Sequence, residues 1–95
     1  MIRSFGDDET ANVFYGRVST RLPASIQKSA LRKLRLIDTA TLLQDLRIPP
    51  GNRLERLKGD RLGQHSIRIN QKWRICFEWE NGDAYYVQIN NHYAR

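Results

Sequence analysis

The C-terminal part of the chain alternates apolar and polar residues in three consecutive segments. These are QHSIRI (64–69), KWRICFEW (72–79) and AYYVQIN (84–90). Alternation with a period of two is typical of strands that bury one face, and the short polar gaps favour antiparallel hairpins. A one-residue slip would turn every apolar side chain to the wrong face, so the pattern also predicts how the strands pair.

The first hairpin brings two arginines together. If Ile67 is to pair with Ile75 on one face, the connecting loop must hold residues 70–72. Arg68 then lies directly opposite Arg74 on the other face. Like charges in this position cost stability, and either splaying into water or binding an anion relieves that cost. We expect this second face to be open and able to hold an anion.

The second hairpin follows from the same reasoning. A loop of residues 81–83, with Gly82 available for a positive φ, places Trp79 opposite Tyr85. One face of the sheet is then apolar, and His65 on that face is expected to be structural. The open face carries Arg68, Arg74, Gln88, Asn90 and His92.

The N-terminal half has helical periodicity. Residues 23–40 predict a helix whose buried stripe consists of Ile26, Ala30, Leu34 and Ile37. A shorter helix is expected within residues 6–15, capped by Asp7 or Asp8. A basic stripe on the longer helix is either solvated or a contact surface for an acidic partner, and it consists of Lys28, Arg32 and Arg35.

Helices that precede an antiparallel meander predict an α+β fold, with two N-terminal helices packed on one face of the sheet. RLERLKG (53–59) is interpreted as the first strand of the meander. The length of 95 residues suits a single domain, 1–95.

The chain is strongly basic, with 16 Lys and Arg against 10 Asp and Glu and a net charge of +6. This balance suggests a polyanion or an acidic protein as partner. Four of the cations lie near the edge of the predicted sheet and would suit the phosphates of a nucleic acid backbone. They are Arg53, Arg56, Lys58 and Arg61.

Other classes of protein are less compatible with the sequence. Cys76 is the single cysteine, and no Cys or His cluster has zinc-binding spacing, so neither a disulfide nor a metal or other cofactor is expected. No apolar run approaches the roughly 20 residues of a membrane helix. The N-terminus lacks the apolar core of a signal peptide. We therefore expect a cytoplasmic protein that does not enter a membrane.

Cleavage of RNA without a metal requires a base for the attacking 2′-hydroxyl, an acid for the leaving oxygen and cations for the phosphate charge. His92 is the natural acid or base, because imidazole titrates near neutral pH. Tyr93, Glu55 and Lys58 are secondary candidates for proton transfer, and Arg74 would stabilise charge. The alternative interpretation of His92 is a tail residue without a catalytic role.

Five stretches together resemble the HigB toxins of the RelE/ParE superfamily, from Met1 to about Tyr93. They are IRSF (2–5), LRLIDTAT (34–41), PPGNRLERLKGDRLGQHSIRIN (49–70), KWRICFEW (72–79) and NGDAYYVQINNHY (81–93). This resemblance implies a RelE-like fold, with two N-terminal helices on a twisted antiparallel sheet. It also implies the toxin of a type II toxin–antitoxin module, an endoribonuclease that cuts mRNA on the ribosome and leaves a 2′,3′-cyclic phosphate.

The resemblance further implies a HigA-type antitoxin with a helix-turn-helix motif, which neutralises the toxin and represses the shared operon by binding operator DNA. Lys58 and Arg74 match basic positions of the family's active site. Two departures concern Glu55, where relatives often have histidine, and the end of the chain, where many have Asp-Tyr-His. This chain has Asn91-His92-Tyr93 there.

These departures leave alternatives open. Glu55 is able to replace the missing imidazole as a base, but a glutamate is mostly ionised at neutral pH and is then a poor acid. The predicted catalytic residues are Glu55, Lys58, Arg74, His92 and Tyr93, and the predicted RNA-binding residues are Arg53, Arg56, Arg61, Arg68 and Asn91. A basic binding module without nuclease activity and a ParE-like toxin that targets gyrase are the other interpretations.

Overall fold

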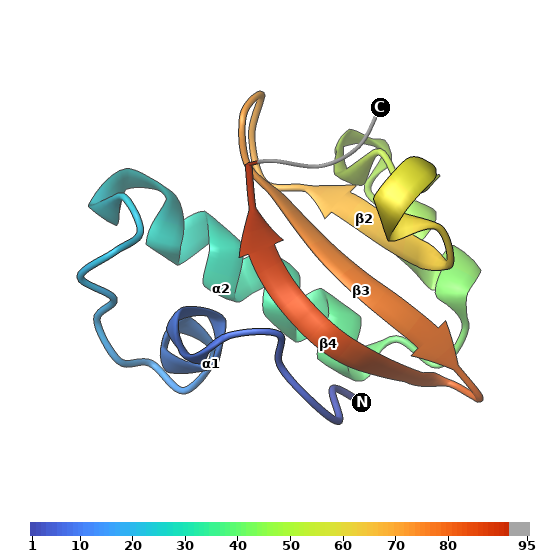
Figure 1. Ribbon diagram of the computed structural model, residues 1–95, viewed down its shortest axis with the longest axis horizontal. Coiled ribbons are helices and arrows are strands. Elements are labelled where there is room, and N and C mark those ends of the chain that lie inside the picture. Colours follow the sequence, from blue (N-terminus) through green and yellow to red (C-terminus); the bar gives the residue numbers. More distant parts are fainter. Residues whose placement is uncertain (92–95) are drawn as a thin grey trace.

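The computed structural model describes residues 1–91, in which two α-helices precede a four-stranded antiparallel sheet (Figure 1). The helices are α1 (Asp8–Phe14) and α2 (Ala24–Thr39). The strands are β1 (Glu55–Arg56), β2 (Gln64–Arg68), β3 (Arg74–Glu80) and β4 (Asp83–Asn90), and they lie side by side in the order β1-β2-β3-β4. The predicted α+β class is confirmed.

Both helices begin where the sequence predicts. The Asp7 carboxylate accepts a hydrogen bond from the Thr10 backbone N–H at 2.8 Å and so caps α1. The Thr10 hydroxyl in turn accepts a hydrogen bond from the backbone N–H of Ile89 at 2.9 Å, which ties α1 to β4. Helix α2 starts directly after Pro23, whose ring cannot continue a helix upstream.

The main hydrophobic core contains buried residues from both helices and from β2, β3 and β4. The predicted stripe of α2 is buried as a whole: Ile26, Ala30, Leu34 and Ile37. From the sheet, the core takes Ile67, Ile75, Phe77, Ala84, Val87 and Ile89. Between α2 and β1 the chain forms the short 3-10 helices η1 (Leu43–Arg47) and η2 (Pro50–Asn52).

The first hairpin has the predicted register. Ile67 pairs with Ile75, and Arg68 pairs with Arg74. The loop of residues 70–72 is closed by the Asn70 side chain, whose oxygen accepts hydrogen bonds at 2.8 Å from the backbone N–H groups of the two residues before Arg74. An Asn side chain that bonds the backbone ahead of it stabilises a tight turn of this kind.

The second hairpin differs from the prediction near its turn. Asn81 and Gly82 both have positive φ, at 51° and 84°, and form a two-residue turn in place of three, because this geometry matches the twist of the strands. Tyr85 therefore pairs with Glu78 on the face of the sheet opposite the main core, here called the outer face. The predicted pairing of Tyr85 with Trp79 is wrong. A bulge at Tyr86 (φ 54°) then restores the register.

Because the short turn and the bulge compensate each other, the far end of the hairpin is as predicted. Ile75 pairs with Ile89, and Arg74 pairs with Asn90. The N-terminal residues lie along the other edge of β4 through isolated parallel bridges, Ile2 with Ala84 and Phe5 with Val87. An edge that would otherwise expose unpaired backbone groups is covered in this way.

The strand predicted at 53–59 is much shorter, and β1 contains only Glu55 and Arg56. Arg53 has a left-handed conformation (φ 46°) at the end of η2, and Gly59 (φ 65°) begins the 3-10 helix η3 (Gly59–Arg61). Both conformations are incompatible with an extended strand. The chain from Arg53 onward instead forms the edge of the sheet at β1, beside β2, and then turns in front of β2 at η3 (Figure 1).

The expectation of an open outer face is therefore wrong in the middle of the sheet. Ser66 and Cys76 pair with each other on that face, and each is completely buried. Leu57 follows β1, donates its backbone N–H to Gln64 at 2.9 Å and is buried outside the main core. Within residues 1–91, the outer face of β3 becomes exposed at Glu78 and Glu80, toward the end of that strand.

Candidate functional site

Arg68 and Arg74 lie opposite each other, and their side chains turn in different directions. The Arg68 side chain donates from Nε to the backbone oxygen of Asn70 at 3.0 Å, toward the loop. The Arg74 side chain turns inward across β2, and this residue is only 5% exposed. The like-charge pair is thus tolerated because one guanidinium is solvated at the loop and the other is held by polar groups.

Within residues 1–91, three hydrogen bonds hold the buried Arg74 guanidinium. Its Nε donates to the Ser66 hydroxyl at 2.8 Å. Its Nη2 donates to the backbone oxygens of Arg53, at 2.7 Å, and of Ser66, at 3.4 Å. A buried cation needs such partners, because transfer from water without them is very costly.

The Arg53 carbonyl is held in place by the turn before it. Asn52 is completely buried, and its side-chain nitrogen donates to the backbone oxygens of Leu46 at 3.1 Å and Ile48 at 3.3 Å. The Lys33 ammonium, on α2, donates to the Asn52 side-chain oxygen. Burial, followed by the nearby charge of Arg32, lowers the pKa of Lys33.

Glu55 lies beside the same guanidinium. Its Oε1 is 3.7 Å from Nη2 of Arg74, so the two groups form a long ion pair. The Glu55 side chain is 49% exposed, whereas the Arg74 side chain is 6% exposed. The acid beside Arg74 thus comes from the short strand β1. One carboxylate and one guanidinium stand together at the edge of the sheet.

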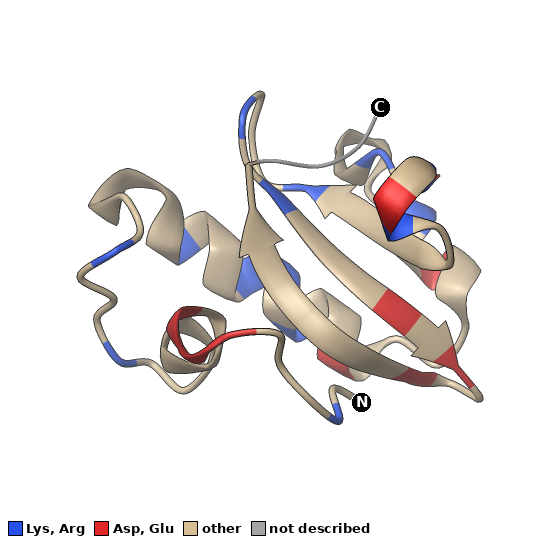
Figure 2. Ribbon diagram, viewed as in Figure 1, with Lys and Arg blue, Asp and Glu red and all other residues tan. Residues whose placement is uncertain are grey.

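These groups line an open hollow of about 480 Å³. Its walls are formed by Arg53, Glu55, Arg68, Gln71 and Arg74. Three guanidinium groups against one carboxylate make the hollow cationic, and Figure 2 shows Lys and Arg in blue where β2 ends and β3 begins. Such a surface can hold a phosphate group through charge-assisted hydrogen bonds, which arginine makes well.

Other predicted residues lie outside this hollow. Arg56 pairs with His65 and therefore extends from the opposite face of the sheet to Glu55. Lys58 is exposed between β1 and η3, and within residues 1–91 it is not among the residues that line the hollow. Arg61 donates to the Gln64 side chain at 3.0 Å, near the other end of β2.

The end of β4 leads toward the hollow. Asn90 pairs with Arg74, so Asn91 follows at the same end of the sheet and is half-buried. The predicted catalytic residues His92 and Tyr93 lie outside the described residues.

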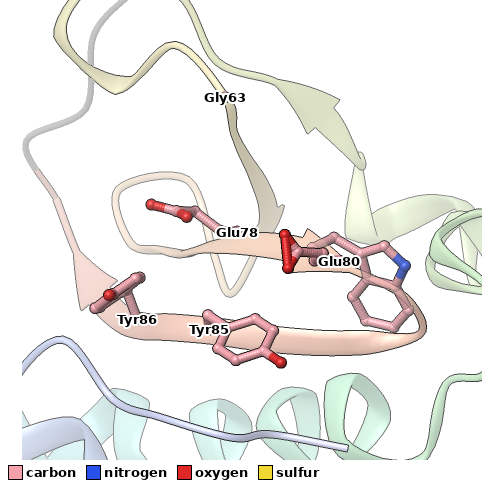
Figure 3. Close-up of a pocket in the computed structure, with 6 residues that line it drawn as sticks. Gly63, Glu78, Glu80, Tyr85 and Tyr86 are labelled. Atoms are coloured by element: carbon pink, nitrogen blue, oxygen red, sulfur yellow. The ribbon is translucent and has the colours of Figure 1, made fainter.

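The opposite end of β3 has the opposite charge. Glu78 and Glu80 line a second hollow of about 360 Å³ together with Trp79, Tyr85, Tyr86 and Gly63, as Figure 3 shows. Figure 2 shows acids in red at this β3–β4 hairpin. A polyanion is attracted to the start of β3 and repelled from its end, so the charges favour the first hollow over the second as an anion site.

Sequence reasoning missed two residues of the site. Gln71 lines the hollow from the β2–β3 loop, and it was expected only as a loop residue. Ser66 holds Arg74, and the signal for it was available, because a serine two positions before Arg68 shares its face. The role of Ser66 depends on how residues 53–61 pack beside β2, which the alternating pattern does not predict.

Two titratable groups near the site have altered pKa values for clear physical reasons. Burial lowers the pKa of His65, and the positive charge of Arg56 lowers it further. His65 pairs with Phe77 on the packed face, with ring centroids 6.0 Å apart, as its structural interpretation requires. Burial raises the pKa of the Cys76 thiol.

Within residues 1–91, no group of three or more His, Cys, Asp or Glu side chains lies close enough together to hold a metal ion. In the same part of the chain, neither α-helix has the length and apolar character needed to cross a membrane.

Comparison with known proteins gives one consistent family. Residues 3–93 match the HigB-like toxin family, described as the RelE-like toxin of the type II toxin-antitoxin system HigB. A protein named Toxin HigB-1 from Vibrio cholerae serotype O1 is 44% identical over 71 residues, which is 75% of each chain. Endoribonuclease HigB from Proteus vulgaris is 36% identical over 98% of this chain and all of its own length. An uncharacterized protein from Haemophilus influenzae is 32% identical over 93% of this chain and 88% of its own.

Proposed function

The chain belongs to the HigB-like family of RelE-like toxins of type II toxin–antitoxin systems, and from this we propose that it is an endoribonuclease that cuts mRNA on the ribosome and stops translation. The proposal treats residues 1–95 as one toxin domain that acts in the cytoplasm. The single observation that carries it is the cationic hollow, in which a buried, hydrogen-bonded Arg74 stands beside the Glu55 carboxylate.

The proposed reaction uses the nucleophile of RNA itself. The 2′-hydroxyl attacks the neighbouring phosphorus, and its proton passes to the Glu55 carboxylate. The bond to the 5′-oxygen breaks, and that oxygen receives a proton from His92. The products are a 2′,3′-cyclic phosphate and a 5′-hydroxyl, with no metal in any step. Lys58 and Tyr93 are the further candidates for proton transfer.

Arg74 has the electrostatic role in this scheme. The phosphate gains negative charge as the 2′-oxygen attacks, and a cation fixed in advance stabilises that charge without reorganisation. The contacts with Ser66 and Arg53 support this role, because they fix the guanidinium before RNA arrives. RNA phosphates would be held by Arg53 and Arg68, which line the hollow, with Asn91 at the same end of the sheet. Arg61, near the other end of β2, and Arg56, on the opposite face, would contact RNA only outside the hollow.

Ribosome dependence is part of the proposal, and the openness of the hollow supports it. Few groups of this small chain surround a bound nucleotide, so much of the positioning would come from mRNA held on the ribosome. The activity on free RNA is then expected to be slow. The replacement of an acid by Asn91, compared with many relatives, favours the same expectation.

The proposed partner is a HigA-type antitoxin with a helix-turn-helix motif, whose complex with the toxin binds operator DNA. The basic stripe of α2 is the proposed contact surface for it. Lys28, Arg32 and Arg35 are all exposed, and Lys28 borders a small hollow between α1 and α2. That hollow also exposes Val18, so an acidic segment with apolar residues would complement it.

Induced expression in cells, followed by mapping of mRNA 5′ ends, tests the proposal. New ends inside reading frames are expected for the wild type and not for Arg74→Ala or His92→Ala. Growth arrest without new mRNA ends would favour the alternative, a basic RNA- or DNA-binding protein or a gyrase-targeting toxin without nuclease activity. Loss of DNA supercoiling before translation stops would identify the gyrase-targeting form.

A further inference from the structure

We propose that Ser66 is a positioning residue that sets the orientation of the Arg74 guanidinium in the hollow. Its effect on cleavage rests on the proposed function, whereas its effect on the guanidinium itself does not. Ser66 accepts from Nε of Arg74 through its hydroxyl at 2.8 Å, and its backbone oxygen accepts from Nη2 at 3.4 Å. One residue therefore contacts two nitrogens on one edge of the guanidinium.

Ser66 is buried, so its hydroxyl depends on a hydrogen-bond partner within the protein. Ser66 lies in the middle of β2, opposite Cys76, and both residues are completely buried. A buried hydroxyl requires a hydrogen-bond partner, and here the partner is a cation that is itself 5% exposed. The hydroxyl and Nε are hydrogen-bond partners, so removal of the hydroxyl takes that acceptor from Nε of Arg74 in a buried site.

The Ser66 hydroxyl supports the guanidinium at a different nitrogen from the Arg53 oxygen. The Arg53 and Ser66 backbone oxygens both receive Nη2. The Ser66 hydroxyl receives Nε and so adds an attachment that opposes rotation of the guanidinium about Nη2. Because a misplacement of about 1 Å can reduce a rate roughly 10²-fold, loss of this contact should reduce cleavage far more than RNA binding.

The direct test is the Nε–H signal of Arg74 in an ¹⁵N–¹H NMR spectrum of the full chain. In the wild type we expect a resolved signal with slow exchange, assigned by its loss in Arg74→Lys. In Ser66→Ala the signal should shift and exchange at least about tenfold faster while the backbone spectrum is retained. Ser25→Ala, at an exposed position of α2, is the matched control and should leave the signal unchanged.

Ser66→Cys is the second variant if Ser66→Ala does not fold, because a thiol has nearly the same shape and is a weaker acceptor. It should give an intermediate exchange rate. An Nε–H signal with wild-type position and exchange in the folded Ser66 variants would overturn the proposal.

A double-mutant cycle then connects position to chemistry. Ser66→Ala should lower the single-turnover cleavage rate roughly 10- to 100-fold in the wild type and have no further effect in Arg74→Lys. An equal loss in both backgrounds would overturn the proposal, because Ser66 would then act independently of Arg74. Full cleavage by Arg74→Lys would contradict the role of Arg74 in the proposed reaction instead, and the NMR result would still decide the role of Ser66.

Discussion

The Glu55 carboxylate lies 3.7 Å from the Arg74 guanidinium, and the two side chains differ in exposure, 49% against 6%. The cation is thus fixed by the fold, whereas the acid remains accessible to a bound molecule. An incoming phosphate would compete with Glu55 for Arg74 and bring a 2′-hydroxyl near the carboxylate. In the proposed reaction, this exchange of anions links RNA binding to proton transfer in one small site.

Glu55→Gln separates these two effects. The change removes a negative charge from the hollow, so RNA affinity should be equal to or higher than that of the wild type. It also removes the proposed proton acceptor, so the single-turnover cleavage rate should fall roughly 10²-fold. Glu78→Gln makes the same charge change at the far end of β3 and should preserve the rate. Unchanged cleavage by Glu55→Gln would exclude this residue as the base.

Arg68→Gln tests whether the hollow holds phosphates. The slope of log affinity against log salt concentration should become less steep by roughly 0.7 to 1, because one fewer phosphate contact forms. The loss of affinity should be similar for RNAs of different sequence. Lys28→Gln, on the basic stripe of α2, has the same charge change and is the control. Equal slopes for Arg68→Gln and the wild type would contradict a phosphate contact.

Thr10→Val tests the tie between α1 and β4. Thr10 is completely buried, and its hydroxyl accepts the Ile89 backbone N–H at 2.9 Å. Valine has nearly the same shape but leaves that N–H without its acceptor, so the free energy of unfolding should fall by about 1–3 kcal/mol. Urea unfolding measures this change. Thr20→Val, at an exposed position, should be close to neutral, and an equally small effect at Thr10 would contradict the account.

The lowered pKa of His65 predicts a pH dependence of stability. Because burial and Arg56 hold this pKa below 6.5 in the folded state, the unfolded chain binds the proton more readily. His65 therefore contributes a loss of stability as the pH falls below 6.5, and none above it. Between pH 7.5 and 5.5, the unfolding free energy should decrease less for His65→Gln than for the wild type. Parallel pH profiles for the two proteins would contradict the assignment.

The sequence predicts the parts of the fold that depend on periodicity. The buried stripe of α2 and the pairing of Arg68 with Arg74 are confirmed, because a shifted pairing would expose apolar side chains. The Trp79–Tyr85 pairing was wrong because a turn and a bulge each change the register by one residue. A three-residue turn without a bulge and a two-residue turn followed by a bulge both place Ile75 opposite Ile89. The apolar pattern alone therefore could not distinguish the two arrangements.

The site was harder to predict because it depends on residues outside the three alternating strands. The left-handed conformation of Arg53 and the buried Asn52 bring a backbone carbonyl to Arg74. These features arise from tertiary contacts with α2 and η1, which have no local signature in the sequence. The cations that line the hollow, Arg53, Arg68 and Arg74, are among the predicted residues, but the burial of Arg74 and the position of Arg56 on the opposite face were not predicted.

The most direct test of the account is the chemistry of the cut ends. Purified wild-type protein and Arg74→Ala are mixed with mRNA on programmed ribosomes, and both ends of each product are analysed. We predict 2′,3′-cyclic phosphate and 5′-hydroxyl ends for the wild type, with a rate at least about 10²-fold lower for Arg74→Ala. Products with 3′-hydroxyl and 5′-phosphate ends, or cleavage by Arg74→Ala at the wild-type rate, would contradict it.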